Sequence, residues 1–172
     1  ISSVSFFPEK EIIDFLKKMK FLMLNININN IPKNIKFNYV SKQLGADRIA
    51  NTFAATNKYG KNSLVIDFGT ATTFDIIINN VYEGGLIAPG IMISHDALIK
   101  NAFKLNKISI TKIKKIIGQS TKNSMQSGFY WGYVSLINGI IKKIIIEKKI
   151  KPKIILTGGL ANIFKSEIKY KT

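Results

Sequence analysis

The sequence predicts a layered domain of the α/β or α+β class, and two observations lead to this prediction. Residues 62–90 contain three apolar runs separated by two short turns, which is typical of an antiparallel meander. Helical patterns follow, and then a last apolar run that ends in the glycine pair Gly158-Gly159. Apolar residues make up 46% of the 172 residues, enough to bury a core of this kind.

A glycine-containing break at 58–62 divides the chain, and we interpret residues 1–60 as the remainder of an N-terminal domain. Before the break, apolar residues recur at helical spacing in two segments and form short runs in two others. The expected elements are the end of a strand at 1–4, a helix at 8–20, a short strand at 21–26, a polar loop at 27–34 and a helix at 44–57.

Residues 61–172 are interpreted as a second domain that begins with the meander. Its first strand ends on Asp67, and Asn79-Asn80 is expected to form a tight hairpin turn because asparagine tolerates positive φ. The expected elements are strands at 64–67, 72–78, 81–88 and 153–156 and helices at 94–103 and 122–149.

The residue inventory excludes several kinds of site. The chain has no cysteine, which rules out disulfides, thiolate zinc sites and a thiol nucleophile. Its one histidine, His95, cannot form a histidine metal cluster, and a Ser-His pair is not expected. No apolar run approaches the roughly 20 residues of a membrane-spanning helix. We therefore expect a cytoplasmic protein without a membrane partner, and the start at Ile1 suggests a true N-terminus further upstream.

The formal net charge of +16 raises the alternative of a nucleic-acid-binding module. The lysines are spread along the chain and form no aromatic-studded stripe, so compositional bias is the better explanation and no nucleic-acid partner is expected. Arg48 is the single arginine among 26 basic residues. Its planar fork grips carboxylate or phosphate in a way that an ammonium cannot, which favours a function for this residue.

Asp67 is one of two acidic residues in unusual settings. It ends a buried strand, where a carboxylate is costly unless a cation or donors compensate, and Gly69 and Thr70 follow in the turn. Such a turn can bind phosphate oxygens through its N–H groups while the carboxylate holds a cation. An ordinary threonine-rich hairpin turn has the same spacing, so both interpretations stay open. Asp75, inside the next strand, is expected to be structural.

Asp47 is the second unusual acid, and it stands in the segment Gly45-Ala46-Asp47-Arg48. Glycine lets a ligand approach the backbone. The carboxylate can accept a proton from a substrate hydroxyl while the neighbouring arginine holds an anion. The alternative is an aspartate that caps the N-terminus of a helix, which is a common use of this residue.

Two glycine-containing features complete the candidates. Gly158-Gly159 after a buried strand lets a flat ligand pack on the backbone, although a plain strand-to-helix turn is commoner. Thr121 is expected to cap the helix predicted from 122, whose N-terminus can hold an anion. Small residues along that helix indicate close packing, either on the sheet or against a second subunit. They are Ser124, Gly128, Gly132, Ser135 and Gly139.

Six segments, taken together, resemble the type III pantothenate kinase family, and they occur in the family's order from Leu44 onward. The family belongs to the actin, hexokinase and chaperone ATPase superfamily. The resemblance therefore implies an α/β fold of two ribonuclease H-like domains, the first incomplete here, with ATP in the cleft between them. The segments are GADRIAN (45–51), DFGTATT (67–73), GGLIAPGI (84–91), IGQST (117–121), SMQSG (124–128) and TGGLA (157–161).

The resemblance also implies a reaction: ATP-dependent phosphorylation of pantothenate, the first step of coenzyme A biosynthesis. It implies Mg²⁺, a monovalent cation (K⁺ or NH₄⁺) and a homodimer. By position, Asp47 resembles the family's proton acceptor and Asp67 its potassium ligand. The other implied positions are substrate contacts at Gly45, Ala46, Arg48 and Thr121 and ATP-site residues at Gly69, Thr70, Gly158 and Gly159.

The chain departs from the family pattern at two places. Nothing matches the Asp-x-Gly-Asn-Thr phosphate loop of the family's first strand, so the 172 residues alone are expected to bind ATP poorly and to be inactive. Around Tyr39 the family's Asn-Pro is absent and its tyrosine is shifted, which affects the pantothenate pocket. The alternative is a non-catalytic regulatory relative with the same fold, and the presence of both Asp47 and Asp67 argues against it.

Overall fold

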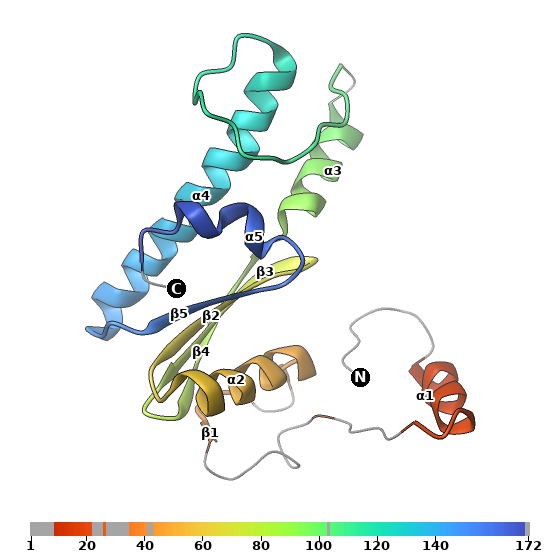
Figure 1. Ribbon diagram of the computed structural model, residues 1–172, viewed down its shortest axis with the longest axis vertical. Coiled ribbons are helices and arrows are strands. Elements are labelled where there is room, and N and C mark those ends of the chain that lie inside the picture. The colour runs from red at the N-terminus through yellow and green to blue at the C-terminus, as the bar shows by residue number, and fades with distance from the viewer. Residues whose placement is uncertain (1–8, 22–25, 27–34, 41–42, 103, 171–172) are drawn as a thin grey trace.

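The computed structural model describes residues 9–21, 26, 35–40, 43–102 and 104–170 (Figure 1). The strand end expected at 1–4 and the polar loop expected at 27–34 lie outside the described residues. Most of the short strand expected at 21–26 lies outside them as well.

A five-stranded sheet forms the centre of the described structure (Figure 1). Its strands are β1 (Lys36–Phe37), β2 (Ser63–Phe68), β3 (Ala71–Ile78), β4 (Val81–Pro89) and β5 (Lys153–Thr157). They lie in the order β1-β4-β3-β2-β5. β2, β3 and β4 pair antiparallel, which confirms the predicted meander, whereas β5 pairs parallel with β2 and β1 parallel with β4.

The turn between β3 and β4 is the tight hairpin that the sequence predicts. Asn79 has φ 51° and Asn80 has φ 63°, both in the left-handed region. Asparagine tolerates this region because its short polar side chain can hydrogen-bond locally. The Asn79 N–H also donates to the side-chain oxygen of Asn62 at 2.8 Å, which ties the turn to the start of β2.

Five α-helices occur among the described residues, and some of their bounds differ from the predicted ones. They are α1 (Glu9–Lys18), α2 (Ala46–Tyr59), α3 (Ile91–Asn101), α4 (Thr121–Lys148) and α5 (Ala161–Phe164). α3 begins at Ile91 rather than Ser94 because Gly90, directly after β4, has an extended backbone and serves as the N-cap. In the part of the chain that the structure describes, no helix is both long and apolar enough to cross a bilayer.

Thr121 is not the N-cap of α4, and the prediction was wrong by one residue. Ser120 has an extended backbone with φ −147° and ψ 157°, and its Oγ accepts a hydrogen bond from the Asn123 N–H at 3.2 Å. Thr121 is therefore the first helical residue. Serine and threonine are both good N-caps, so the sequence alone does not show which of two adjacent hydroxyl residues accepts the capping hydrogen bond.

The main apolar core lies between the sheet and α4. Leu64 and Ile66 of β2 and Phe74 of β3 contribute to it, together with α4 side chains such as Tyr130 and Ile137. All five of these side chains are completely buried. This packing explains why such a long helix follows the meander: its apolar face covers one side of the sheet.

The opposite side of the sheet is covered by α2. Successive strand residues point to opposite faces, so Val65 and Ile77 turn away from α4 and pack with Ala55 of α2. Figure 1 shows α2 and α4 separated by the strands. The face under α2 carries buried polar residues as well as apolar ones, including Arg48 and Asp75.

Candidate active site

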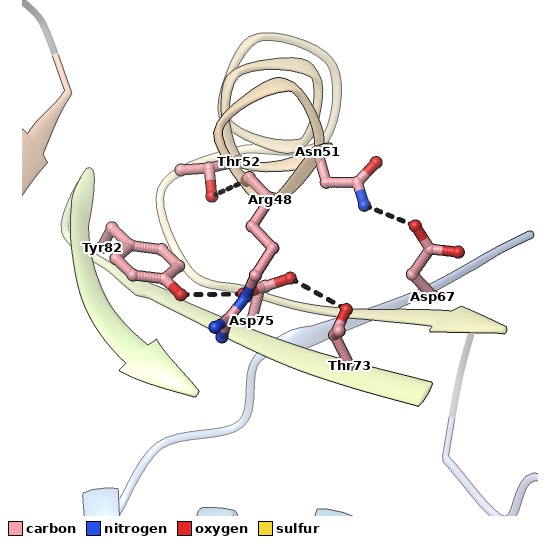
Figure 2. Close-up of polar contacts among 7 residues, drawn as sticks. All are labelled: Arg48, Asn51, Thr52, Asp67, Thr73, Asp75 and Tyr82. Atoms are coloured by element: carbon pink, nitrogen blue, oxygen red, sulfur yellow. Dashed lines mark hydrogen bonds and ion pairs between the residues drawn. The ribbon is translucent and has the colours of Figure 1, made fainter. Parts of the chain in front are cut away.

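Polar side chains from three segments meet on the face of the sheet that α2 covers (Figure 2). Arg48 and Asn51 come from the first half of α2, and Asp75 comes from the middle of β3. Asp67 lies near the carboxyl end of β2. The helix thus reaches two acidic residues of the sheet from two positions on its surface.

Arg48 forms an ion pair with Asp75. The Arg48 Nε donates to the Asp75 Oδ1 at 2.7 Å, and the two residues are 5% and 0% exposed. The sequence suggests Asp47 as the neighbour of this guanidinium, but consecutive residues on a helix do not face each other. Asp75 thus holds Arg48, the only arginine of the chain, against the sheet, which agrees with the structural role predicted for it.

Two further donors complete the surroundings of the Asp75 carboxylate. The Tyr82 hydroxyl donates to Oδ1 at 2.9 Å, and the Thr73 hydroxyl donates to Oδ2 at 3.3 Å. Burial raises the pKa of Asp75, while the Arg48 charge and the donated hydrogen bonds act in the opposite direction. Burial also raises the pKa of Tyr82, which keeps its hydroxyl protonated. A carboxylate that only accepts hydrogen bonds suits these three donors.

The guanidinium of Arg48 lies between two aromatic rings. Its central carbon is 5.9 Å from the ring centre of Tyr39 and 5.8 Å from that of Tyr82, within the range of cation–π attraction. Tyr39 is 38% exposed, so it separates Arg48 from solvent on this side. The tyrosine whose position departs from the family pattern thus still lies beside the arginine.

One nitrogen of Arg48 is left without a hydrogen bond. Nη2 is buried and has no partner among the described residues. It lies against Gly85, where an added Cβ would be 2.7 Å from Nη2. Gly85 pairs with Asp75 across β3 and β4, so the absence of a side chain there gives the guanidinium its room.

Asp47 lies in the first turn of α2 and is partly buried. It is not the N-cap, because that position is taken by Gly45, with φ −62° and ψ 147°. The Asp47 carboxylate folds back over Gly45 and occupies the space that a Cβ there would need. A carboxylate in the first turn is favoured by the helix dipole, and it borders a stretch of backbone that a ligand can approach.

Asp67 lies at the carboxyl ends of the parallel strands β2 and β5. Its Oδ2 accepts a hydrogen bond from the Asn51 amide at 2.8 Å. Gly158, just after β5, has φ 90°, and an added Cβ would lie 2.6 Å from the Asp67 Oδ1 and 2.6 Å from the Phe68 carbonyl oxygen. The chain therefore needs glycine at 158 both for its backbone angle and for the close approach to Asp67.

The turn that follows Asp67 is held against the start of α3. The Gly69 N–H donates to the Ala71 carbonyl at 3.1 Å, and the Gly90 N–H donates to the Thr70 carbonyl at 3.1 Å. Gly69 and Thr70 are exposed, so the turn is open to a ligand. Asp67, Gly69, Thr70 and Gly158 are thus brought to one end of the sheet, as the prediction of a phosphate-binding turn requires.

Two further predicted site residues lie outside this group. Thr121 is the first residue of α4, which lies across the sheet from α2, and its substrate contact near a dimer interface stays a prediction. Gly159 is exposed, and an added Cβ there would meet nothing within 4 Å. Close approach therefore depends on Gly158 and not on its neighbour.

Sequence reasoning missed Asn51, Thr73 and Tyr82 as members of this site. A signal for the first existed, because Asn51 follows Asp47 by one helical turn on the same side of α2. Thr73 and Asp75 are two residues apart on β3 and so point to one face. Tyr82 carried no such signal, because its contact with Asp75 depends on how β4 pairs with β3.

Two kinds of oxygen atom lie near Gly158, from the Asp67 side chain and from the Phe68 main chain. The described part of the chain contains no group of three or more Asp, Glu or His residues that could hold a metal ion. Around Gly158 the oxygen atoms are the Asp67 carboxylate and the Phe68 carbonyl. One carboxylate with main-chain carbonyls is a set of hard oxygen ligands of low total charge.

Comparisons with known proteins agree on one family. The family model described as type III pantothenate kinase matches residues 1–143. A type III pantothenate kinase of Pelagibacter ubique is 45% identical over 146 residues, covering 85% of this chain and 57% of that protein. One of Persephonella marina is 49% identical over 131 residues, covering 75% and 51%. The chain spans about half the length of the curated relatives it matches.

A solved structure supports the fold. It is titled as a conserved putative Baf family transcriptional activator from Campylobacter jejuni. It superposes with a TM-score of 0.53 at 22% sequence identity, covering 93% of this chain and 79% of that one. At this identity the likeness concerns the arrangement of helices and strands alone.

We predict that Gly158→Ala destabilises the protein by about 1–3 kcal/mol, because alanine is strained at positive φ and its Cβ would collide with Asp67. Gly159→Ala is the matched control and should change the free energy of unfolding by less than about 0.5 kcal/mol. Urea denaturation followed by circular dichroism measures both. Equal stability of the two variants would show that the backbone does not need glycine at 158.

Proposed function

Because the chain belongs to the type III pantothenate kinase family, we propose that the enzyme containing it transfers the γ-phosphoryl group of ATP to the hydroxyl of pantothenate. This reaction is the first step of coenzyme A biosynthesis. The observation that carries the proposal is the start of α2. There Asp47 folds back over Gly45 at the helix start, and Arg48 is held by Asp75 with one nitrogen that has no partner among the described residues.

Asp47 accepts the proton of the pantothenate hydroxyl in this proposal. A carboxylate is a weak base, but phosphoryl transfer passes through a loose transition state in which a strong base is not required. Gly45 and Ala46 bring their backbone close to the substrate, and Arg48 binds its carboxylate. The main contribution of these residues is to hold the hydroxyl in line with the phosphoryl group.

The exposed turn at Gly69 and Thr70 binds the ATP phosphates in this proposal, through backbone N–H groups and the threonine hydroxyl. Gly158 and Gly159 offer a flat stretch of backbone to the nucleotide. Mg²⁺ enters with ATP, since this ion commonly combines substrate phosphates with one or two carboxylates. The absence of a larger acidic cluster among the described residues is compatible with such a site.

Asp67 is the proposed ligand of K⁺ or NH₄⁺, together with the Phe68 carbonyl that borders the same space at Gly158. A cation there neutralises part of the negative charge that gathers at the neighbouring phosphate turn. Asn51 keeps one carboxylate oxygen of Asp67 occupied, and the other oxygen faces Gly158.

The proposed architecture is that of two ribonuclease H-like domains, with 1–60 in the first and 61–172 in the second. In the described structure β1 pairs with β4 and α2 packs on β2 and β3, so part of 1–60 lies directly against the sheet of 61–172. ATP would lie between the domains, and the described turn at 69–70 would grip its phosphates from one side. The reaction is expected in the cytoplasm, and neither a nucleic-acid nor a membrane partner is proposed.

We also propose that the enzyme is a homodimer that packs through α4. An added Cβ at Gly128, Gly132 or Gly139 meets nothing within 4 Å, so the small residues of α4 are not packed on the sheet. Glycine inside a helix costs about 1 kcal/mol relative to alanine, which favours a close partner for this face. Such packing would also let Thr121 approach the substrate of the partner subunit. A monomer in light scattering at micromolar concentration would contradict this proposal.

Asp47→Asn should lower turnover by at least about 100-fold, because the amide cannot accept the hydroxyl proton. The fold should persist, since Asp47 lies at a helix start outside the apolar cores. A coupled assay of ADP release with pantothenate measures the effect, and Asp14→Asn on the exposed side of α1 is the control. Full turnover of Asp47→Asn in the full-length enzyme would remove the assigned role, and an inactive full-length wild-type enzyme would favour the regulatory alternative.

Replacing K⁺ by Na⁺ at constant ionic strength should lower turnover roughly tenfold or more, because one carboxylate and carbonyl oxygens select a cation by size. Asp67→Asn should remove most of the difference between the two salts. Thermal unfolding in KCl and NaCl provides a second readout, in which only the wild-type protein should be more stable in KCl. Equal rates in both salts would argue against a cation at Asp67.

A further inference from the structure

The ion pair of Arg48 with Asp75 is unusual because it contains only one hydrogen bond between the guanidinium and the carboxylate. Arginine and carboxylate commonly form two parallel hydrogen bonds, since the guanidinium fork matches the two carboxylate oxygens. Here Asp75 Oδ1 accepts from Nε at 2.7 Å, while Nη2, which shares that edge of the guanidinium, has no partner among the described residues. The second bond that would complete the fork is missing.

The second carboxylate oxygen is engaged elsewhere. Asp75 Oδ2 accepts a hydrogen bond from the Thr73 hydroxyl at 3.3 Å, and the Tyr82 hydroxyl donates to Oδ1 at 2.9 Å (Figure 2). Thr73 is two residues before Asp75 on β3, so both side chains point toward α2. Thr73 is 9% exposed and lies within the site. Its hydroxyl therefore sets the rotation of the carboxylate.

The unpartnered nitrogen needs an explanation. A buried donor without an acceptor costs about 1–3 kcal/mol, and native proteins leave few of them unless a ligand or water takes the bond. Nη2 lies directly against Gly85, where a side chain would displace it, and the partly exposed ring of Tyr39 covers the guanidinium on another side. An acceptor that enters past Tyr39 would meet a guanidinium already fixed in place.

We propose that Thr73 is a positioning residue for substrate binding: its hydrogen bond orients Asp75 so that Oδ2 is turned away from the guanidinium, which keeps Arg48 Nη2 free for the carboxylate of the acceptor substrate. The proposal rests on the proposed function, since it assumes that Arg48 binds the anionic end of pantothenate. It adds to that function the residue that keeps the binding atom available.

A merely structural role for Thr73 predicts the opposite pattern. If the hydroxyl only stabilises the fold, its removal lowers the free energy of unfolding and leaves substrate affinity unchanged. If it positions Asp75, its removal lets Oδ2 turn to Nη2 and complete the fork. Stability is then unchanged or raised, while the substrate loses its partner.

Thr73→Val tests this difference, because valine has nearly the shape of threonine, favours strands and lacks the hydroxyl. We expect Kd and KM for pantothenate to rise roughly tenfold, the loss of one charge-assisted hydrogen bond, with kcat changed less than about twofold. The melting temperature should not fall. Thr73→Ser, which keeps the hydroxyl, is the matched control and should bind pantothenate with affinity close to that of the wild type.

Calorimetric titration with pantothenate, thermal unfolding and steady-state kinetics of the intact enzyme give the three readouts. Unchanged Kd in a folded Thr73→Val variant overturns the proposal, as does a lower melting temperature with unchanged Kd. Should Thr73→Val not fold, Thr73→Ala replaces it under the same criteria. Arg48→Lys tests the premise that Arg48 binds the substrate carboxylate. An unchanged Kd for pantothenate in Arg48→Lys refutes that premise. Weaker binding in Arg48→Lys with normal binding in Thr73→Val refutes only the inference about Thr73.

Discussion

The buried ion pair between Arg48 and Asp75 fixes the position of α2, because it joins the first turn of that helix to the middle of the sheet. A buried charge left without its partner is expensive, and breaking such a pair typically costs about 3–5 kcal/mol. The bonds from Tyr82 and Thr73 leave the carboxylate little freedom to follow a moving helix. Asp47 precedes Arg48 by one residue and therefore takes its position from the same contact.

A second contact, between Asn51 and Asp67, fixes the orientation of α2 as well as its position. One ion pair alone would let α2 pivot about Arg48, but the amide of Asn51 reaches the end of β2 almost one helical turn further along. Two attachments on the same side of a helix fix both its rotation and its tilt. The start of α2 and the turn after Asp67 thus share one rigid element.

Local signals account for what the sequence predicted well. The meander is confirmed, and its β3–β4 turn is determined by Asn79-Asn80, which both adopt positive φ. The start of α3 was predicted three residues late, because the extended backbone of Gly90 lets the helix begin directly after β4. The cap of α4 was predicted one residue late, because it depends on a single hydrogen bond from Asn123 to Ser120. The partner of Arg48 could not be predicted, because it depends on which face of β3 meets α2 and on the register of that packing.

The parallel pairing of β5 with β2 sets an order in which this fold can assemble. β2, β3 and β4 follow one another through turns of a few residues, whereas β5 returns to β2 only after α3 and α4. Loop-closure entropy grows with the length of the intervening chain, and non-local pairing slows folding. Gly158 reaches Asp67 only when β5 has docked, so this end of the sheet is completed after the meander. Any ligand that bound only this completed end would favour the docked edge strand by mass action, so its binding would raise the free energy of unfolding.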